Sequence, residues 1–474
     1  MKKLFIYIIP VILLAACTKD ITKLNNDPKN PTNVPPATLF TNAQRSLART
    51  LVSSNVNVNI FRLIVQYWQE VTYLDESRYD LNTRSIPQNF WTPLYRDALK
   101  DFSEARKLIP SQSLDAGQKA NEVAITDIME VYTWYYIVTT YGNVPYTEAL
   151  NIENVFPKYD DAATIYNALL TRLDADIAAL NPSAESFGSA DIIYGGDPAA
   201  WKKFANSLKL KMGMTIADAD AAKAKTTVES AVASGVFTSN ADNAEFSFLS
   251  APPNTNPIWE DLVQSGRKDF VAASTIIDTM KFLNDPRIDN YFTVDGSGGY
   301  SGGGPGRSSN YGTYSKPATA ITAPNFPGLL LDYSEVEFFL AEAVERGFNV
   351  GGTAMTHYNN AVTASILYWG GTTTEATTYL AQPSVNYLTA PGTYKQKIGI
   401  QKWIALYNRG VDAWIEWRRL DFPRLQPAFR AVSAIPKRFT YPIIEQNYNT
   451  ANYNQAAAAI GGDVVTTKLW WDKF

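Results

Sequence analysis

The fold class follows from residues 124–145, which read Ala-Ile-Thr-Asp-Ile-Met-Glu-Val-Tyr-Thr-Trp-Tyr-Tyr-Ile-Val-Thr-Thr-Tyr-Gly-Asn-Val-Pro. Apolar side chains recur there at the intervals of a helix face, and a second apolar stripe runs beside the first. A helix that is apolar on two sides packs between neighbouring helices. Gly142 and Pro145 then follow in the order that ends a helix. We therefore predict a buried helix that ends just before Gly142.

Similar helical patterns recur on both sides of this segment. Ser334 precedes Glu337 at the spacing of a capping box, which predicts a helix that ends at Gly347. A third apolar stripe at helical spacing contains Trp403, Tyr407, Val411 and Trp414. Arg418 and Arg419 follow it in the last turns of the predicted helix, which ends before Pro423. Apolar runs that predict further helices cover residues 40–51, 91–108, 162–180, 201–217 and 273–283. These patterns predict an all-α fold in which helix packs on helix.

Two stretches interrupt the helical pattern. Residues 295–316 are rich in Gly and Ser and hold too little apolar surface to fold independently, so they predict a long loop. Residues 371–397 are rich in Thr, Tyr and Pro and predict a second long connection. Long loops on a rigid helical body often carry function.

The N-terminus has the pattern of an export signal that ends in a lipidation site. Lys2 and Lys3 precede an apolar run, residues 4–14, and Ala15 and Ala16 precede Cys17, the one cysteine of the 474 residues. The run has about half of the roughly 20 residues needed to span a bilayer, which favours a cleaved signal. We predict a signal peptide over residues 1–16, a lipid anchor on Cys17, a proline-rich tether over residues 17–36 and one helical domain over residues 37–474.

The composition is that of a globular protein with a modest acidic charge. Apolar residues make up 46% of the chain and charged residues 19%. Without Lys2 and Lys3, the 42 Lys and Arg fall to 40, against 46 Asp and Glu. This acidic net charge makes nucleic acid, or another polyanion, an unexpected partner.

No catalytic signature fits its surroundings. Residues 299–303 match G-x-S-x-G, and His357 is the one histidine, but Ser301 lies in a Gly-rich loop and not between a strand and a helix. One His and a lipidated Cys cannot build a zinc site, although carboxylate sites for calcium stay open. The clustered Glu335, Glu342 and Glu345 indicate a solvated helix face. We expect no catalytic residue, no metal site and no cofactor.

Seven ordered segments carry a resemblance to a known family. They are residues 26–36, 141–150 (Tyr-Gly-Asn-Val-Pro-Tyr-Thr-Glu-Ala-Leu), 201–210, 285–287, 337–347, 401–403 and 414–423. Together they resemble the SusD/RagB family of surface lipoproteins, which cap TonB-dependent transporters of Bacteroidetes-type bacteria, and specifically its SusD-like branch. The resemblance covers nearly the whole mature chain.

The resemblance implies an all-helical body with degenerate tetratricopeptide-like helix pairs and long loops that face a ligand. It further implies a lipid-anchored outer-membrane protein, facing the cell exterior, that captures oligosaccharides and delivers them to a SusC-like TonB-dependent transporter without cleaving them. Family members place ligand-binding aromatics on loops after the first helix and in the middle of the chain. The corresponding residues here are Tyr73, Tyr79, Trp259, Tyr300, Asn310, Tyr311 and Tyr314.

Three alternatives remain at this point. An oligopeptide could take the place of the glycan within the same transporter class. A surface-anchored glycan hydrolase would need a pair of carboxylates whose separation the sequence does not give. A helical scaffold of a surface complex would have a transporter partner but no small ligand.

Overall fold

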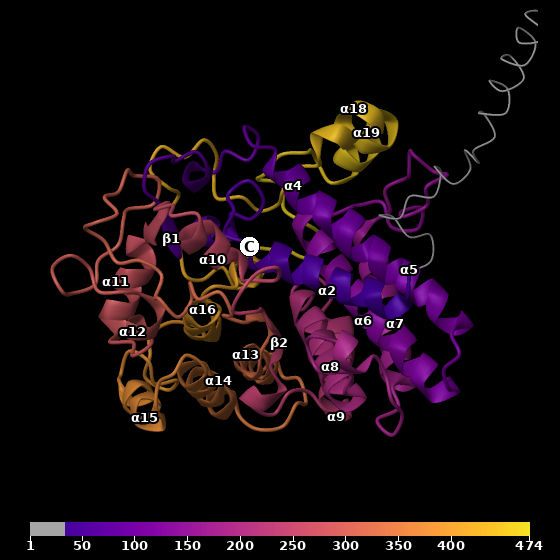
Figure 1. Ribbon diagram of the computed structural model, residues 1–474. Coiled ribbons are helices and arrows are strands. Elements are labelled where there is room, and N and C mark those ends of the chain that lie inside the picture. Colours follow the sequence, from indigo (N-terminus) through magenta and orange to yellow (C-terminus); the bar gives the residue numbers. More distant parts are fainter. Residues whose placement is uncertain (1–33) are drawn as a thin grey trace, which may run out of the picture.

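Helix α6 (Ala116–Tyr141) packs among other helices and is buried over most of its length. The computed structural model describes residues 34–474 (Figure 1). The predicted signal peptide, Cys17 and most of the predicted tether lie outside these residues. Asp115 caps the start of α6, where its carboxylate accepts the backbone N–H of Gln118 at 2.9 Å.

Gly142 ends α6, as the sequence predicted. Its φ of 87° lies in the region that favours glycine, and its N–H donates to the carbonyl oxygen of Val138. A Cβ at this position would lie 2.9 Å from Leu469 Cδ2, so the C-terminal segment packs closely against the end of the helix.

Helices make up most of the remaining described chain. Before α6 they are α2 (Pro36–Val52), α3 (Phe61–Ile64), α4 (Ile86–Thr92) and α5 (Lys100–Leu108), with a π-helical segment Pro93–Leu99 between the last two. After α6 they are α7 (Ala162–Ala179), α8 (Pro198–Thr215), α9 (Ala221–Ser234), α10 (Pro257–Trp259), α11 (Ser274–Leu283), α12 (Ile288–Tyr291), α13 (Tyr333–Glu345), α14 (Ala354–Tyr368), α15 (Thr373–Ala381), α16 (Tyr394–Ala405), α17 (Gly410–Leu420), α18 (Ile443–Tyr448) and α19 (Thr450–Ala459).

Consecutive helices pack against each other in pairs. The pairs are α6 with α7, α8 with α9, α13 with α14 and α16 with α17. Figure 1 shows α5 to α9 gathered at the right of the molecule and α11, α12, α14 and α15 at the left. Buried apolar side chains from Phe40 to Trp471 form one continuous cluster. The all-α prediction with helix pairs is confirmed.

Two details of α13 correct the sequence analysis. Asp332 caps the helix by accepting the N–H of Glu335 at 3.0 Å, whereas Ser334 donates its hydroxyl to the carbonyl oxygen of Ala361. Glu335 and Glu342, predicted on a solvated face, are 1% and 0% exposed because buried arginines pair with them. Helical spacing identified the helix but not these partners, which come from much later in the chain.

Two predicted segments have a different organisation. The stripe from Trp403 to Trp414 belongs to two helices, α16 and α17, because the chain turns at Asn408, whose φ is 70°. The predicted connection over residues 371–397 contains α15, which begins in a capping box between Thr372 and Glu375, and the first turn of α16.

Two small antiparallel sheets complete the described fold. β1 (Trp68–Glu70) pairs with β3 (Phe270–Ala272), and β2 (Ala244–Phe246) pairs with β4 (Gly328–Leu331). The register of the first sheet sets Trp68 opposite Ala272 and Glu70 opposite Phe270. No helix of residues 34–474 is both long and apolar enough to cross a membrane.

Candidate functional site

The β1–β3 sheet brings together the two regions that the sequence analysis named as ligand-binding. β1 leads into the loop that contains Tyr73, and β3 follows the loop that contains Lys268. The backbone N–H of Val71 donates to the carbonyl oxygen of Asp269 at 2.8 Å, so the pairing continues past the strand ends. Segments about 200 residues apart in sequence therefore meet at one edge of this sheet.

The Gly-rich loop, residues 295–316, is folded onto the same sheet. Ser309 N–H donates to the carbonyl oxygen of Val71 at 3.0 Å, and Ala272 N–H donates to that of Ser315 at 2.8 Å. Gly302 runs so close to the backbone of Ala273 that a Cβ would approach within 2.5 Å. The segment is a loop, as predicted, and its backbone is fixed against β3 by these hydrogen bonds.

Two adjoining depressions lie at this edge. One, of about 60 Å³, is lined by Val56, Glu70, Val71, Thr72, Tyr73, Arg84, Arg267, Lys268 and Asp269. The other, of about 50 Å³, shares Val56, Arg84, Arg267 and Asp269 with it and adds Ser54, Asn55, Asn57, Asp261 and Phe270. We call this surface, together with the neighbouring Tyr311, the ligand face.

Two predicted residues lie on the ligand face, and two more lie on the Gly-rich loop that adjoins it. Tyr73 is 70% exposed and lines the first depression. Tyr311 is half-buried, and its ring lies 5.8 Å from the ammonium group of Lys268, which lines the same depression. Asn310 is exposed, and its side-chain oxygen accepts the N–H of Gly312. Tyr314 is half-buried on the same loop.

Three other predicted residues lie apart from the depressions. Tyr79 is 2% exposed, and its hydroxyl accepts the N–H of Ala428, so its ring belongs to the core. Trp259 is half-buried on α10 and lines neither depression. Tyr300 is half-buried, and burial, together with the neighbouring Asp289 carboxylate, raises the pKa of its phenol to about 12.

Glu70, which lines the first depression, belongs to a buried pair of acids with Glu76. The backbone N–H of Ser77 donates to Glu70 Oε2 at 2.8 Å, and Arg84 is ion-paired with Glu76. Burial, reinforced by the nearby Glu76, raises the pKa of Glu70 to about 9. Glu70 is therefore uncharged at neutral pH, and the charge of Glu76 is balanced by Arg84.

Sequence reasoning missed part of the ligand face. Val56, Asn55 and Asn57 lie on the short turn after α2, and Arg267 and Lys268 lie on the loop before β3. These short polar segments have no periodicity or motif. The one available signal was Gly266, which marked a turn beside two consecutive cations.

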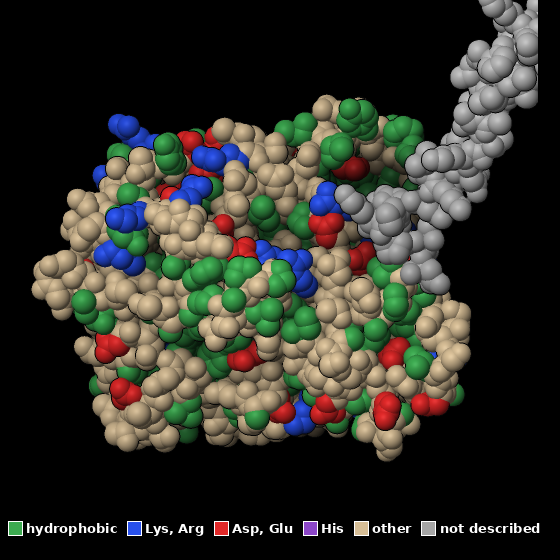
Figure 2. Space-filling view, in the orientation of Figure 1, with side chains coloured by type: hydrophobic (Ala, Val, Ile, Leu, Met, Phe, Trp, Pro, Cys, Tyr) green, Lys and Arg blue, Asp and Glu red, His purple; other side chains and the backbone are tan. Residues whose placement is uncertain are grey.

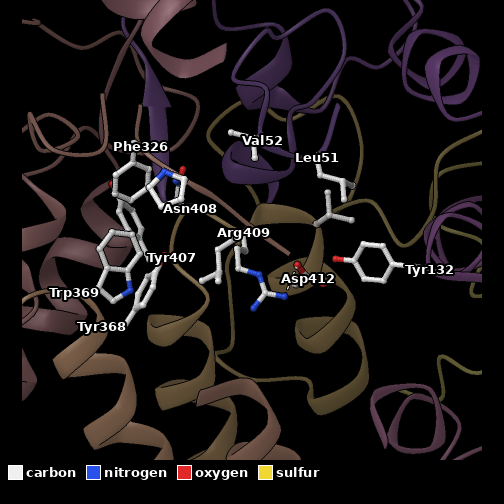
Figure 3. Close-up of a pocket in the computed structure, with 13 residues that line it drawn as sticks. Leu51, Val52, Tyr132, Phe326, Tyr368, Trp369, Tyr407, Asn408, Arg409 and Asp412 are labelled. Atoms are coloured by element: carbon white, nitrogen blue, oxygen red, sulfur yellow. Dashed lines mark ion pairs between the residues drawn. The ribbon is translucent and has the colours of Figure 1, made fainter. Parts of the chain in front are cut away.

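Two other hollows of the described chain are less suited to a sugar. The cavity of Figure 3 measures about 20 Å³, room for about one water. There Arg409 points toward Asp412, at 2.9 Å, beside a group of aromatic rings. A groove of about 500 Å³ beside α5 contains Trp134, but this side chain is only 2% exposed, and the Arg106 and Arg172 of the groove are paired with Glu130.

The residues of the G-x-S-x-G match do not assemble into a catalytic pair. Ser301 donates its hydroxyl to Asp295 at 2.7 Å. His357 lies on α14, where Nδ1 faces Glu337 at 2.6 Å and Nε2 faces the carbonyl oxygen of Gly351 at 3.1 Å. Both ring nitrogens are thus engaged away from the serine. Within residues 34–474, no three His, Cys, Asp or Glu side chains are grouped as a metal ion requires.

Comparison with known proteins identifies the family. A SusD-like family described as starch-binding and associating with the outer membrane matches residues 28–442. The chain belongs to this SusD-like family. No curated protein matches the chain.

Solved structures agree with the SusD-like assignment. A structure named as a chitin-binding protein is 28% identical, with a TM-score of 0.81 over 93% of this chain and 100% of that one. A SusD homologue from Bacteroides uniformis is 27% identical, with a TM-score of 0.80 over 92% of this chain and 99% of that one. A chitin-binding SusD homologue from Flavobacterium johnsoniae, 23% identical, has a TM-score of 0.80 over 92% of this chain and 98% of that one, and shows the common fold. The predicted fold and family are confirmed.

Proposed function

We propose that this SusD-like protein is an outer-membrane lipoprotein that binds oligosaccharides and passes them, uncleaved, to a SusC-like TonB-dependent transporter. The family description, starch-binding and associating with the outer membrane, supports the ligand class and the location. The lipidation pattern at Cys17 supports a lipid anchor in a membrane. The names of two structural neighbours, which are chitin-binding proteins, support a glycan ligand.

One observation carries the proposal: Tyr73 lines the first depression, and the ring of Tyr311, far away in sequence, lies 5.8 Å from the ammonium nitrogen of Lys268, which lines it too. A sugar ring has an apolar face and a rim of hydroxyls. Tyrosine offers a flat contact surface and loses few rotatable bonds on binding. The exposed Tyr73 can stack against a sugar, and the amides of Asn55 and Asn57 on the adjoining depression can bond to its hydroxyls.

The test measures binding of oligosaccharides by calorimetry, with the mature chain from residue 17 made soluble by Cys17→Ser. We expect saturable binding that Tyr73→Ala weakens at least 10-fold, because the variant removes the most exposed ring of the ligand face. Tyr448→Ala is the matched control, since Tyr448 is 73% exposed on α18. Its affinity should stay within two-fold of the wild type.

Three results would contradict the proposal. Chromatography of the incubated sugar should show no products, and cleavage would identify a hydrolase. Binding of oligopeptides but not of sugars would identify a peptide carrier. Binding of neither would favour a scaffold.

For the partner, we expect a TonB-dependent transporter to copurify with the lipidated protein from detergent extracts.

A further inference from the structure

Two unpaired lysines flank Tyr311 on the ligand face. The ammonium nitrogens of Lys268 and Lys316 lie 5.8 and 5.2 Å from the centre of its ring. Neither nitrogen has a carboxylate within 4.0 Å among residues 34–474. Because both distances share one ring centre, the two nitrogens lie at most 11 Å apart. Two cations thus lie beside one ring, and neither has a carboxylate partner among the described residues.

The surrounding charges leave this cationic excess in place. Asp269 is paired with Arg267 at 2.6 Å. Arg84 balances Glu76, and Glu70 is uncharged at neutral pH. Asp295, on the Gly-rich loop, accepts hydrogen bonds from Ser297, Ser301 and Gly299. Asp295 keeps its negative charge because these partners are neutral, and Asp261 lines the second depression, but neither carboxylate forms an ion pair with Lys268 or Lys316.

Two further cations extend the same surface. Arg307 is exposed and lies over the ring of Phe429 at 3.8 Å, and Arg78 donates to the carbonyl oxygen of Gly306. Neither forms an ion pair within residues 34–474. Figure 2 shows Lys and Arg side chains gathered at the upper left of the molecule, where Figure 1 places β1 and the loops around it. Lys and Arg side chains are thus concentrated at this face, although the net charge of the chain is acidic.

We propose that the oligosaccharide taken up by this ligand face is anionic and carries a carboxylate or a sulfate that binds between Lys268 and Lys316. This inference rests on the proposed glycan-binding function and specifies its substrate class. Two like charges held near one ring repel each other, and an anion placed between them relieves that repulsion. Lys268 lines the depression of about 60 Å³, which has room for about four waters, the size of a charged substituent and not of a whole ring. Lys316 lies outside this lining, beside the ring of Tyr311. The exposed Tyr73 on its rim then contacts the sugar that bears the substituent.

The experiment compares three oligosaccharides of equal length: neutral chitooligosaccharides, oligogalacturonides that carry carboxylates, and a sulfated oligosaccharide. Calorimetry with the soluble mature chain should show at least 10-fold tighter binding of a charged sugar than of the neutral one. Comparison of the two charged sugars identifies the anionic group. Raising NaCl from 50 to 500 mM should weaken binding of the charged sugar and leave that of the neutral sugar unchanged.

The double variant Lys268→Gln/Lys316→Gln should lose at least 10-fold in affinity for the charged sugar. Lys119→Gln/Lys468→Gln removes two positive charges elsewhere on the surface and should change that affinity less than two-fold. Tighter binding of the neutral sugar, with a loss in Tyr73→Ala, would overturn this inference and leave the proposed function standing. Binding of none of the three sugars would overturn both.

Discussion

Glu342 shows how single residues acquire roles that local spacing does not reveal. Its carboxylate accepts hydrogen bonds from both terminal nitrogens of Arg419, each at 2.6 Å. Arg346 lies on the next turn, and its Nε is 2.8 Å from Glu342 Oε1. Burial opposes the charge, but these arginines outweigh it and lower the pKa of Glu342 to about 2. Lys402 and Glu416 extend this buried network across α16 and α17. Helical periodicity predicted a solvated face because it reports one helix and not the charges that pack on it.

His357 provides a pH-dependent prediction at the same scale. Burial disfavours its charged form, but the hydrogen bond and charge of Glu337 and the carbonyl oxygen of Gly351 outweigh burial and raise the pKa of His357. Tyr333 also faces Glu337. A raised folded-state pKa stabilises the fold fully below the unfolded value of about 6.5, and this contribution disappears as the pH rises through the folded pKa.

We therefore expect His357→Gln to lower the melting temperature by about 1–2 °C at pH 5.5 and by less at pH 8.5. Differential scanning calorimetry at the two pH values checks this. Lys225→Gln, at an exposed i,i+4 pair with Glu229, should show no such pH dependence. An equal loss at both pH values would mean that the imidazole contributes by packing alone.

At the scale of elements, the sequence predicted helices better than their ends. Apolar residues at helical spacing identified α6, α7, α8 and α11, because each of these helices buries a continuous apolar face. The break between α16 and α17 escaped notice because Tyr407 and Val411 keep the helical interval across it. It occurs where Gly410 packs on Arg62, whose backbone nitrogen would lie 2.7 Å from an added Cβ. A contact with a residue so distant in the sequence does not change the spacing of apolar residues, so the sequence pattern does not reveal it.

The end of α6 gives the prediction at this scale. Gly142→Ala should destabilise the protein by about 1–3 kcal/mol, because the backbone there has φ 87° and ψ −125°, which alanine rarely adopts. The added methyl group would also meet Leu469 Cδ2. Urea denaturation monitored by circular dichroism measures the loss. Gly461→Ala is the matched control, since Gly461 has φ 85° but an added Cβ would meet nothing within 4 Å. A loss no larger than that of Gly461→Ala would assign the whole effect to backbone conformation.

At the scale of the whole molecule, the ligand face was only half predictable. The resemblance pointed to the loops that carry Tyr73 and Tyr311, and the β1–β3 pairing brings them together. The same resemblance included Tyr79, which the short 3₁₀ turn Glu76–Arg78 directs into the core. Lys268 and Lys316, 48 positions apart, become neighbours only through the fold of the Gly-rich loop. Charge on a face depends on such long-range pairings, whereas net charge does not.

The C-terminus connects distant parts of the molecule and supports the last prediction. Trp471 is fully buried, and the guanidinium of Arg418 on α17 lies 4.6 Å from its ring. Leu469, two residues earlier, packs against the end of α6. Trp471→Ala should therefore destabilise the protein by about 3–5 kcal/mol, a large fraction of the 5–15 kcal/mol typical of folded proteins. Phe474→Ala, at a ring that is 40% exposed, should lose less than about 1 kcal/mol. Urea midpoints from circular dichroism distinguish the two variants. Equal midpoints would mean that the last residues contribute little to the core, and a large gap would show that the buried Trp471 is part of what stabilises it.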